Sequence, residues 1–190
     1  NIDDLINKLE MPDGEIPILP TKNLVLFPGV MLPILIGKNP TAGQMLNAER
    51  DESIIGVVNQ TNTDTETPEQ GDMAQLGVFA RVMKCIEMPG GMVTCIVQAL
   101  GKMKIKTFHR LGKMLFATAE PIPEKNVYKN DMEFKQACEN LKQTTMKFIH
   151  ANEDIPDESG MTLESLNNDT LLINFIASNM PFSTKAKLEM

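Results

Sequence analysis

Residues 16–37 read IPILPTKNLVLFPGVMLPILIG, and this stretch decides how the rest of the chain is interpreted. Two apolar runs, Ile16–Leu19 and Leu32–Ile36, flank its middle part. The middle part holds the turn-forming residues Pro20, Asn23, Pro28 and Gly29. Each run is too short for a helix, and its prolines lack an amide hydrogen. The pattern therefore predicts two strands that can lie at the edge of a sheet. They are joined by a loop whose conformation the turn-forming residues restrict.

The composition is that of a folded chain. The chain has 190 residues, of which 42% are hydrophobic, and this fits one large domain or two small ones with a real core. Methionine is abundant, with 14 residues, while tryptophan is absent. Methionine fills irregular gaps in a core and also suits adaptable binding surfaces, so both interpretations stay open.

The charge balance argues against nucleic acid as a partner. The net charge is −7, whereas a nucleic-acid interface requires a clustered basic face. One basic cluster exists, formed by Lys102, Lys104, Lys106, His109, Arg110 and Lys113. Its first three members alternate with Met103, Ile105 and Thr107, which is the pattern of the solvent face of a strand.

Location is indicated by what the sequence lacks. No run of about 18 apolar residues is present, so no membrane span is expected. The first ten residues mix acidic, basic and apolar types and do not form a signal peptide. We therefore expect a cytoplasmic protein.

Three cysteines, Cys85, Cys95 and Cys138, have neither a metal-ligand spacing nor an even number for disulfides. Cys85 and Cys95 flank a Pro-Gly-Gly turn. A three-residue loop, Pro89–Gly91, would place the two cysteines directly opposite each other, whereas a two-residue loop would place them on opposite faces. Proline suits the first central position of a type I turn, which favours the three-residue loop and predicts adjacent, reduced thiols.

The part of the chain from residue 15 to residue 123 is predicted to be rich in strands. Asn39 followed by Pro40 marks a short helix that ends near Glu52. Strands are expected at residues 53–60, 76–88, 92–100, 102–108 and 115–121, with a bulge at Gly101 and a polar surface loop at residues 61–71. Six or seven strands with one small helix indicate a partly closed β-barrel or folded sheet.

Residues 128–190 follow a helical period instead. A helix of about 20 residues is expected to begin after Asn130 or Asp131. Its apolar stripe would consist of Ala137, Leu141, Thr144, Met146, Phe148 and Ile149. Residues 154–160 are expected to break the helical pattern.

Three further caps complete the helical part. Thr162 is expected to cap a short turn, Asn168 or Asp169 a second helix, and Ser183 a last helix that the chain truncates. At the other end of the chain, residues 1–14 are interpreted as a leader that is either a short helix or disordered.

No catalytic constellation is expected in this sequence. His109 and His150 are not tied by spacing to a cysteine or a serine, and no phosphate-binding loop of the GxxxxGK[ST] type is present. We therefore predict no catalytic residue, no cofactor-binding residue and no metal ligand in this segment.

Several motifs occur in an order that resembles the N-terminal domain of the ATP-dependent Lon proteases. They are the opening stretch, Ile54–Gln60, Leu76–Val82, the Met-Pro-Gly-Gly turn, Val97–Gly101 and Leu172–Met180. The resemblance extends from about Glu15 to Met190. It implies an α+β fold with a PUA-like β-barrel subdomain followed by a small helical subdomain. Gly90 stands where the family commonly has an acidic residue.

The resemblance also implies a role in protein quality control and stress response. In this family the region recognises unfolded or damaged substrates and contributes to a homohexamer. The ATPase part, which binds ATP and magnesium, and the Ser–Lys dyad of the protease part have no counterpart here. Two alternatives remain, namely a PUA-like RNA-binding domain, which fold analogy permits, and a stand-alone protein-interaction or assembly domain.

The residues expected to contact substrate proteins lie at two loops. Pro28, Val30 and Met31 follow the first predicted strand, and Met88 and Met92 flank the hairpin tip. If they are contiguous and exposed, they mark an interaction surface. The alternative is that they pack against neighbouring strands.

Overall fold

The computed structural model describes residues 13–37, 39–123 and 130–190. These residues form two compact units. The described residues of the first unit are 13–37, 39–123 and 183–190, and those of the second are 130–182. The predicted leader, residues 1–14, lies almost entirely outside the described residues. No helix in the described ranges is long and apolar enough to cross a lipid bilayer.

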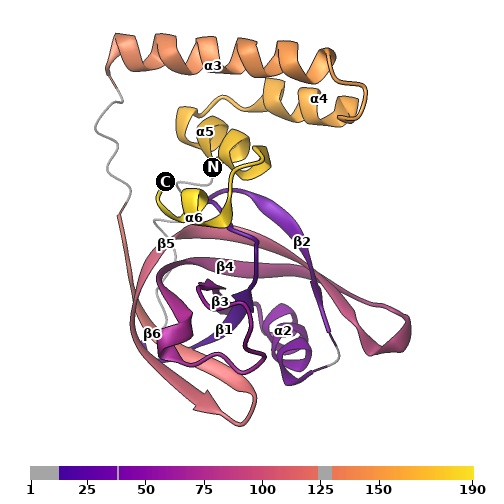
Figure 1. Cartoon of the computed structure of the whole chain (residues 1–190), viewed down its shortest axis with the longest axis vertical. Helices are drawn as coiled ribbons and strands as arrows, with labels where there is room; N and C mark the ends of the chain where they lie inside the picture. Colours follow the sequence, from indigo (N-terminus) through magenta and orange to yellow (C-terminus); the bar gives the residue numbers. More distant parts are fainter. Residues whose placement is uncertain (1–12, 38, 124–129) are drawn as a thin grey trace. The chain divides into compact units, whose positions relative to one another are not determined.

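The first unit is built on one mixed six-stranded sheet (Figure 1). Its strands are β1 (Ile16–Thr21), β2 (Met31–Ile36), β3 (Ile54–Gln60), β4 (Met73–Glu87), β5 (Val93–Leu111) and β6 (Met114–Pro121). The order is β2-β5-β4-β3-β1-β6, and β6 also pairs with β5. The five strands other than β2 therefore close into a barrel, while β2 lies beside β5 as a strand whose second edge has no strand neighbour among the described residues.

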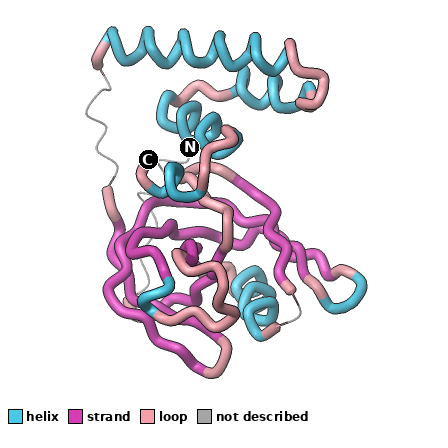
Figure 2. Tube along the Cα trace, in the orientation of Figure 1, coloured by secondary structure: helices cyan, strands magenta, loops and turns pink. Residues whose placement is uncertain are grey.

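This architecture confirms the predicted α+β class with its partly closed barrel. β1 and β3 are parallel, and all other strand pairs of the described sheet are antiparallel. Figure 2 shows the strands in magenta and the helices in cyan. The parallel pair is possible because helix α2 (Pro40–Arg50) lies in the connection between the two strands. As predicted, Asn39 caps α2, and its side chain accepts a hydrogen bond from the Ala42 amide at 3.3 Å.

Two apolar clusters fill the first unit. The first joins α2 to the inner side of the sheet and includes Met45, Ile55, Val97 and Cys95, all fully buried. The second lies under the other end of the barrel around Ile18, Val58, Phe79 and Met103. The alternation predicted for the basic strand is confirmed from Met103 to Lys106, because Met103 and Ile105 are buried while Lys104 and Lys106 are exposed. It fails at Thr107, which is exposed where the register shifts.

The loop of the opening stretch is folded down onto the barrel. Leu26 and Phe27 are buried, and the Val30 amide donates to the Phe27 carbonyl at 3.0 Å. Gly29 has a φ of +82°, a conformation that glycine adopts without a steric penalty. Its amide donates to the Ala99 carbonyl of β5 at 2.9 Å, so the loop is fixed directly to a barrel strand.

The second unit contains α3 (Met132–His150), α4 (Asp157–Ser165) and α5 (Asp169–Asn179). Their shared core consists of Cys138, Ile149, Leu163, Leu172 and Ile176. Asp131 and Asn168 cap α3 and α5, which decides between the alternatives that the sequence left open. A further short helix, α6 (Thr184–Leu188), belongs to the first unit and is capped by Ser183, as predicted.

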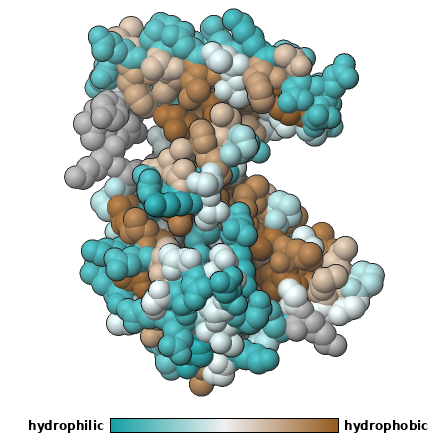
Figure 3. Space-filling model, viewed as in Figure 1, coloured by the Kyte–Doolittle hydropathy of each residue, from teal (hydrophilic) through white to brown (hydrophobic). Residues whose placement is uncertain are grey.

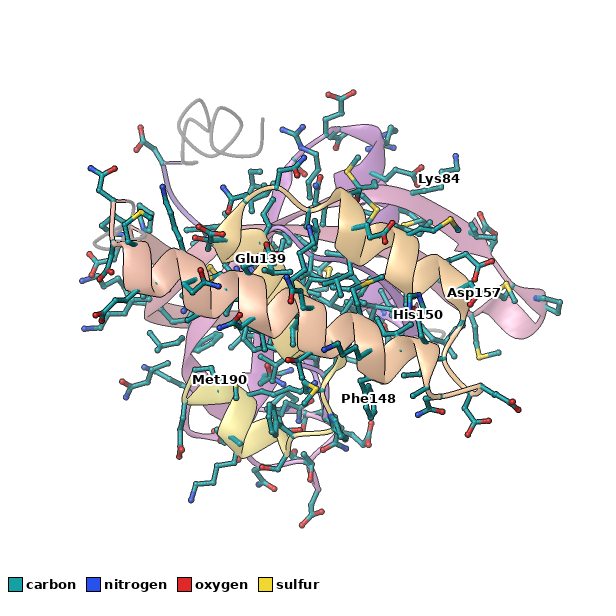
Figure 4. All side chains as sticks on the ribbon, turned by 90° about the horizontal axis from the view of Figure 1, so that it is seen from above. Lys84, Glu139, Phe148, His150, Asp157 and Met190 are labelled. Carbon is teal, nitrogen blue, oxygen red and sulfur yellow. The ribbon has the colours of Figure 1, made fainter. Side chains whose placement is uncertain are left out.

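The predicted apolar stripe of α3 is largely wrong. Cys138 and Ile149 are buried in the core of the unit, whereas Ala137, Leu141 and Thr144 are exposed. Phe148, which is labelled in Figure 4, is 57% exposed. Met146 is partly buried. The sequence carries apolar residues on two adjacent faces of this helix, and α4 and α5 cover only the face that contains Cys138.

The predicted break at residues 154–160 is confirmed only for residues 154–156, which lie in the connection between α3 and α4, and the predicted cap at Thr162 is wrong. Helix α4 begins at Asp157, directly after Pro156, and two acidic residues occupy its first turn. Such residues favour a helix N-terminus. Gly160 does not break the helix. It is buried against α3, where a Cβ would lie only 3.7 Å from Ile149, and this packing offsets the low helix propensity of glycine.

Candidate protein-binding surface

Beyond α2, strands β4 and β5 continue as a long hairpin, and β2 pairs with the outer part of β5 (Figure 1). We call this three-stranded region the arm. It consists of Met31–Ile36, residues 81–87 and residues 93–98. Because it is made of paired strands, the arm holds its side chains in a fixed arrangement.

Register places the side chains of the arm in rows across the three strands. One row contains Leu35, Thr94 and Ile86, since both Leu35 and Ile86 lie opposite Thr94. The next row contains Pro33, Ile96 and Lys84, and the third contains Met31, Gln98 and Arg81. Directly opposite residues project to the same side of a sheet, so these rows share one side of the arm, which we call the outer face.

The outer face is apolar and open to solvent. Leu35 is 62% exposed, and Met31 and Ile86 are each 47% exposed. Figure 3 shows hydrophobic surface gathered over β2 and the neighbouring strands of the arm. On the inner side, Ile34, Cys95 and Val97 are buried in the first apolar cluster. The arm therefore has two apolar sides, of which only one is covered, and an uncovered apolar side is typical of an interaction surface.

The hairpin tip confirms the predicted three-residue loop. Cys85 lies directly opposite Cys95, and the Met88 amide donates to the Met92 carbonyl at 2.8 Å across the loop. The predicted type I turn is wrong, however. Gly90 has φ +85° and ψ 4°, which are the angles of the second central residue of a type II turn, a position that favours glycine.

The five residues expected at a substrate surface are divided by the structure. Met31, Met88 and Met92 are exposed by 47%, 43% and 41%. Pro28 and Val30 are buried, so for these two the alternative holds and they pack against the protein. The turn that attaches the loop to Ala99 holds both residues against the protein. Whether any of the five contacts a substrate stays a prediction.

The sequence reasoning missed the residues that make the outer face continuous, namely Pro33, Leu35, Ile86 and Ile96. One signal was available, because Met31, Pro33 and Leu35 alternate along a strand with Leu32, Ile34 and Ile36. Both sets are apolar, so the alternation did not show which set is buried. That choice is made by α2, which covers Ile34 and Ile36.

The backbone of β2 presents a partly interrupted edge. The Ala99 amide donates to the Val30 carbonyl at 3.0 Å, and backbone direction alternates along an antiparallel strand. Leu32, Ile34 and Ile36 therefore bond to β5, whereas the backbone of Met31, Pro33 and Leu35 faces the edge that has no strand neighbour among the described residues. Proline is tolerated at such a position because its missing amide hydrogen breaks no bond in the sheet.

Charged side chains border the outer face. Lys84 forms an ion pair with Glu49 of α2 at 3.4 Å, and its exposed position is visible in Figure 4. Arg81 differs, because its Nε atom is buried and has no hydrogen-bond partner in the described part of the chain. Among these two cations, Lys84 is therefore paired with a carboxylate, whereas the buried Nε atom of Arg81 lacks a hydrogen-bond partner among the described residues.

A groove of about 720 Å³ runs beside β2, between Pro33–Gly37 and the loop that contains Glu66. Two of its basic groups already have partners. Lys22 is paired with Glu66 at 3.0 Å, and the Arg110 guanidinium donates to the Pro68 carbonyl. The groove is therefore poorly suited to binding a phosphate backbone.

Other members of the basic cluster are similarly engaged. Lys106 lies 2.7 Å from Glu120, and His109 lies 3.1 Å from Glu15. Within the ranges that the structure describes, no three or more His, Cys, Asp or Glu side chains are grouped so as to hold a metal ion. The apolar outer face is thus the feature best suited to binding, and its chemistry matches a polypeptide.

The sequence matches the family model of the ATP-dependent protease La (LON) substrate-binding domain over residues 15–190. The chain belongs to this Lon domain family. It is 33% identical over 182 residues to a Lon protease of Flavobacterium johnsoniae, and the match covers 96% of this chain and 22% of the relative. It is 30% identical over 188 residues to a Lon protease of Parabacteroides distasonis, covering 99% of this chain and 23% of the relative.

Solved structures show the same fold. The N-terminal domain of Mycobacterium avium complex Lon protease matches with a TM-score of 0.67 at 16% identity, over 92% of this chain and 87% of that one. At such identity the likeness concerns the fold alone. This Lon substrate-binding domain spans between a fifth and a quarter of the length of the two curated relatives.

Proposed function

We propose that the outer face of the arm binds apolar segments of unfolded or damaged proteins and that this chain is the non-catalytic substrate-recognition module of a Lon protease. One observation supports the proposal above all. Met31, Leu35 and Ile86 form an uncovered apolar face on paired strands, within a domain whose family is described as substrate-binding. Unfolded chains expose the apolar side chains that such a face can bury.

The surroundings of the face support a protein ligand rather than RNA. Basic residues near it, such as Lys84 and Lys22, are paired with carboxylates. The net charge of −7 opposes a polyphosphate partner. Binding to apolar side chains is driven by loss of water-accessible area, so its affinity should depend little on salt.

The test uses a matched pair of single substitutions. Leu35→Ser removes the most exposed side chain of the outer face, and Leu111→Ser removes a leucine of similar exposure, 58% against 62%, at the end of β5. A fluorescent, permanently unfolded polypeptide is titrated with each variant. We expect Leu35→Ser to weaken binding by about 3- to 10-fold, the equivalent of losing roughly 1 kcal/mol of apolar burial, and Leu111→Ser to bind like the unmodified chain.

Two results would contradict the proposal. If the two variants bound the polypeptide with equal affinity, the outer face would not be its binding site. Tight RNA binding that weakens steeply between two salt concentrations would favour the RNA-binding alternative instead. Both variants should keep the far-UV circular dichroism of the unmodified chain, because neither side chain is buried.

We further propose that the parent protein is a cytoplasmic, ATP-dependent serine endopeptidase in which ATP and magnesium act outside this segment. Its homohexamer would hold several outer faces together and so raise the effective concentration of binding sites for one substrate chain. The curated relatives named Lon protease support this view. Sedimentation of this chain alone tests its contribution to assembly: a monomer at micromolar concentration would assign assembly to other parts of the parent.

A further inference from the structure

Cys85 of β4 and Cys95 of β5 form a cross-strand pair on the inner side of the arm. The two residues are directly opposite in register, and their Sγ atoms are 2.7 Å apart. Both side chains are buried, with 8% and 0% of their surface exposed. The two sulfur atoms therefore lie on the same side of the sheet.

The backbone hydrogen bonds show that Cys85 and Cys95 form a non-hydrogen-bonded pair of the antiparallel ladder. The Cys85 amide donates to the Oε2 atom of Glu49 at 3.0 Å and therefore not to β5. Residues that exchange no ladder bonds in an antiparallel pair have Cα atoms about 4.5 Å apart, closer than hydrogen-bonded pairs. This separation lies within the range of about 4.4–6.8 Å found for disulfides.

We propose that Cys85 and Cys95 are an oxidative modification site, which a peroxide converts into a disulfide across the arm. One sulfur, as thiolate, attacks a peroxide oxygen, forms a sulfenic acid and releases hydroxide, which takes up a proton to become water. The sulfur of the second cysteine then attacks the sulfenic sulfur, so that the S–S bond forms and a second water leaves. With hydrogen peroxide, two thiols and one peroxide give one disulfide and two waters, and the sulfurs lose the two electrons that the peroxide gains.

The environment makes this reaction slow but selective. Burial raises the pKa of both thiols, and the nearby carboxylate of Glu49 raises it further. Thiolate is therefore scarce at neutral pH, and reaction requires local opening of the hairpin. Once one sulfur is oxidised, its neighbour is already in place. The disulfide therefore forms in preference to higher oxidation states.

The bond would change the stability of the arm. It closes a short loop around the hairpin tip and so removes freedom from the unfolded chain. For a chain of this size we expect the melting temperature of the first unit to rise by about 5–10 °C. Ile86, Thr94 and Ile96 would then stay in register at temperatures at which the reduced arm opens.

Trypsin provides a direct measurement, because no lysine or arginine lies between residue 85 and Lys102, so both cysteines fall in one peptide. The chain is treated with hydrogen peroxide, alkylated without reduction, digested and analysed by mass spectrometry. We expect the peptide Cys85–Lys102 to be about 2 Da lighter than its dithiol form and free of alkyl groups, and dithiothreitol to restore both alkylation sites. Formation should be faster at pH 8.5 than at about pH 7, since the thiolate fraction rises with pH.

Cys138 is the internal control, because it is buried in the second unit, where the described residues include no other cysteine. It should be alkylated or singly oxidised but not cross-linked within the chain. Cys95→Ser should abolish the mass loss of about 2 Da and the gain in melting temperature. Two alkyl groups on the peptide after prolonged oxidation, or sulfinic acid at both positions, would overturn the proposal. Should Cys95→Ser misfold, Cys85→Ala carries the same expectations.

Discussion

The side chain of Asn59 donates a hydrogen bond of 2.7 Å to the carbonyl oxygen of Leu24, 35 residues earlier in the chain. The same oxygen accepts a bond from the Thr21 hydroxyl at 3.0 Å. Asn59 is buried at the end of β3, so this link fixes the loop of the opening stretch to the centre of the barrel. A loop carbonyl thereby obtains the partners that a buried polar group requires.

Replacing Asn59 should destabilise the first unit without disturbing its surface. Asn59→Ala leaves the Leu24 carbonyl with one of its two partners and creates a small cavity. We expect the free energy of unfolding to fall by about 1–2 kcal/mol, measured by urea denaturation. Thr63→Ala, at an exposed residue of the following loop, should change it by less than about 0.5 kcal/mol. Equal effects would show that the buried hydrogen bond contributes nothing specific.

Two glycines with opposite surroundings allow a test of packing in the first unit. A Cβ at Gly77 would lie 2.7 Å from the Val57 carbonyl oxygen, a backbone atom that cannot move aside. Gly77→Ala should therefore destabilise the unit by about 1–3 kcal/mol. Gly43 lies in α2, and no atom lies within 4 Å of the position a Cβ would take, so Gly43→Ala should stabilise the unit by about 0.5–1 kcal/mol. Thermal melts of both variants should thus shift in opposite directions.

The cap of α3 predicts a difference between neighbouring residues. The Asp131 carboxylate accepts bonds from the amides of Glu133 at 2.9 Å and Phe134 at 3.2 Å. Asp131→Ala should lower the stability of the second unit by about 1 kcal/mol, and Asn130→Ala should be nearly neutral. Amide hydrogen exchange in the first turn of α3 measures both. Faster exchange in the Asn130 variant alone would contradict the assignment of the cap to Asp131.

Asp72 should make the structure of the polar loop sensitive to acid. Its pKa is lowered by a hydrogen bond from the Glu69 amide and then by one from the Asn62 side chain. A carboxyl with a lowered folded-state pKa stabilises the fold above its unfolded-state pKa, and this contribution disappears as the pH falls through the folded-state pKa. NMR titration should place the Asp72 pKa below 3.8. Asp72→Asn should loosen the loop at neutral pH and make no difference in strong acid.

Much of the fold was predictable because local chemistry agrees with the tertiary structure. Asn39 before Pro40 and Ser183 before α6 cap helices wherever the chain places them. The Pro-Gly-Gly loop fixes the register of its own hairpin, which is why the opposition of Cys85 and Cys95 follows from three loop residues. In each case the determinants lie within a few residues of the feature.

The errors have the opposite origin. Gly160 resembles a helix breaker, yet it lies within α4, where packing against Ile149 of α3 offsets its low helix propensity. The outer face is composed of residues as apolar as those on the inner side, and only the position of α2 decides which side is buried. Arg81 could not be identified from the sequence, since the burial of its Nε atom depends on neighbours from other strands. The pattern of neighbouring residues does not predict features that depend on residues far away in the chain.

The proline at position 33 has a consequence for the protein at high concentration. The unpaired backbone groups of a strand edge can form hydrogen bonds with the edge of another copy. In a domain with an uncovered apolar face, such pairing favours the growth of fibres. On the unpaired side of β2 the amide hydrogens belong only to Met31 and Leu35, because Pro33 supplies none between them. A second copy of the chain thus cannot complete a continuous ladder along this edge. Pro33 therefore opposes edge-to-edge growth of the sheet while the apolar outer face stays uncovered.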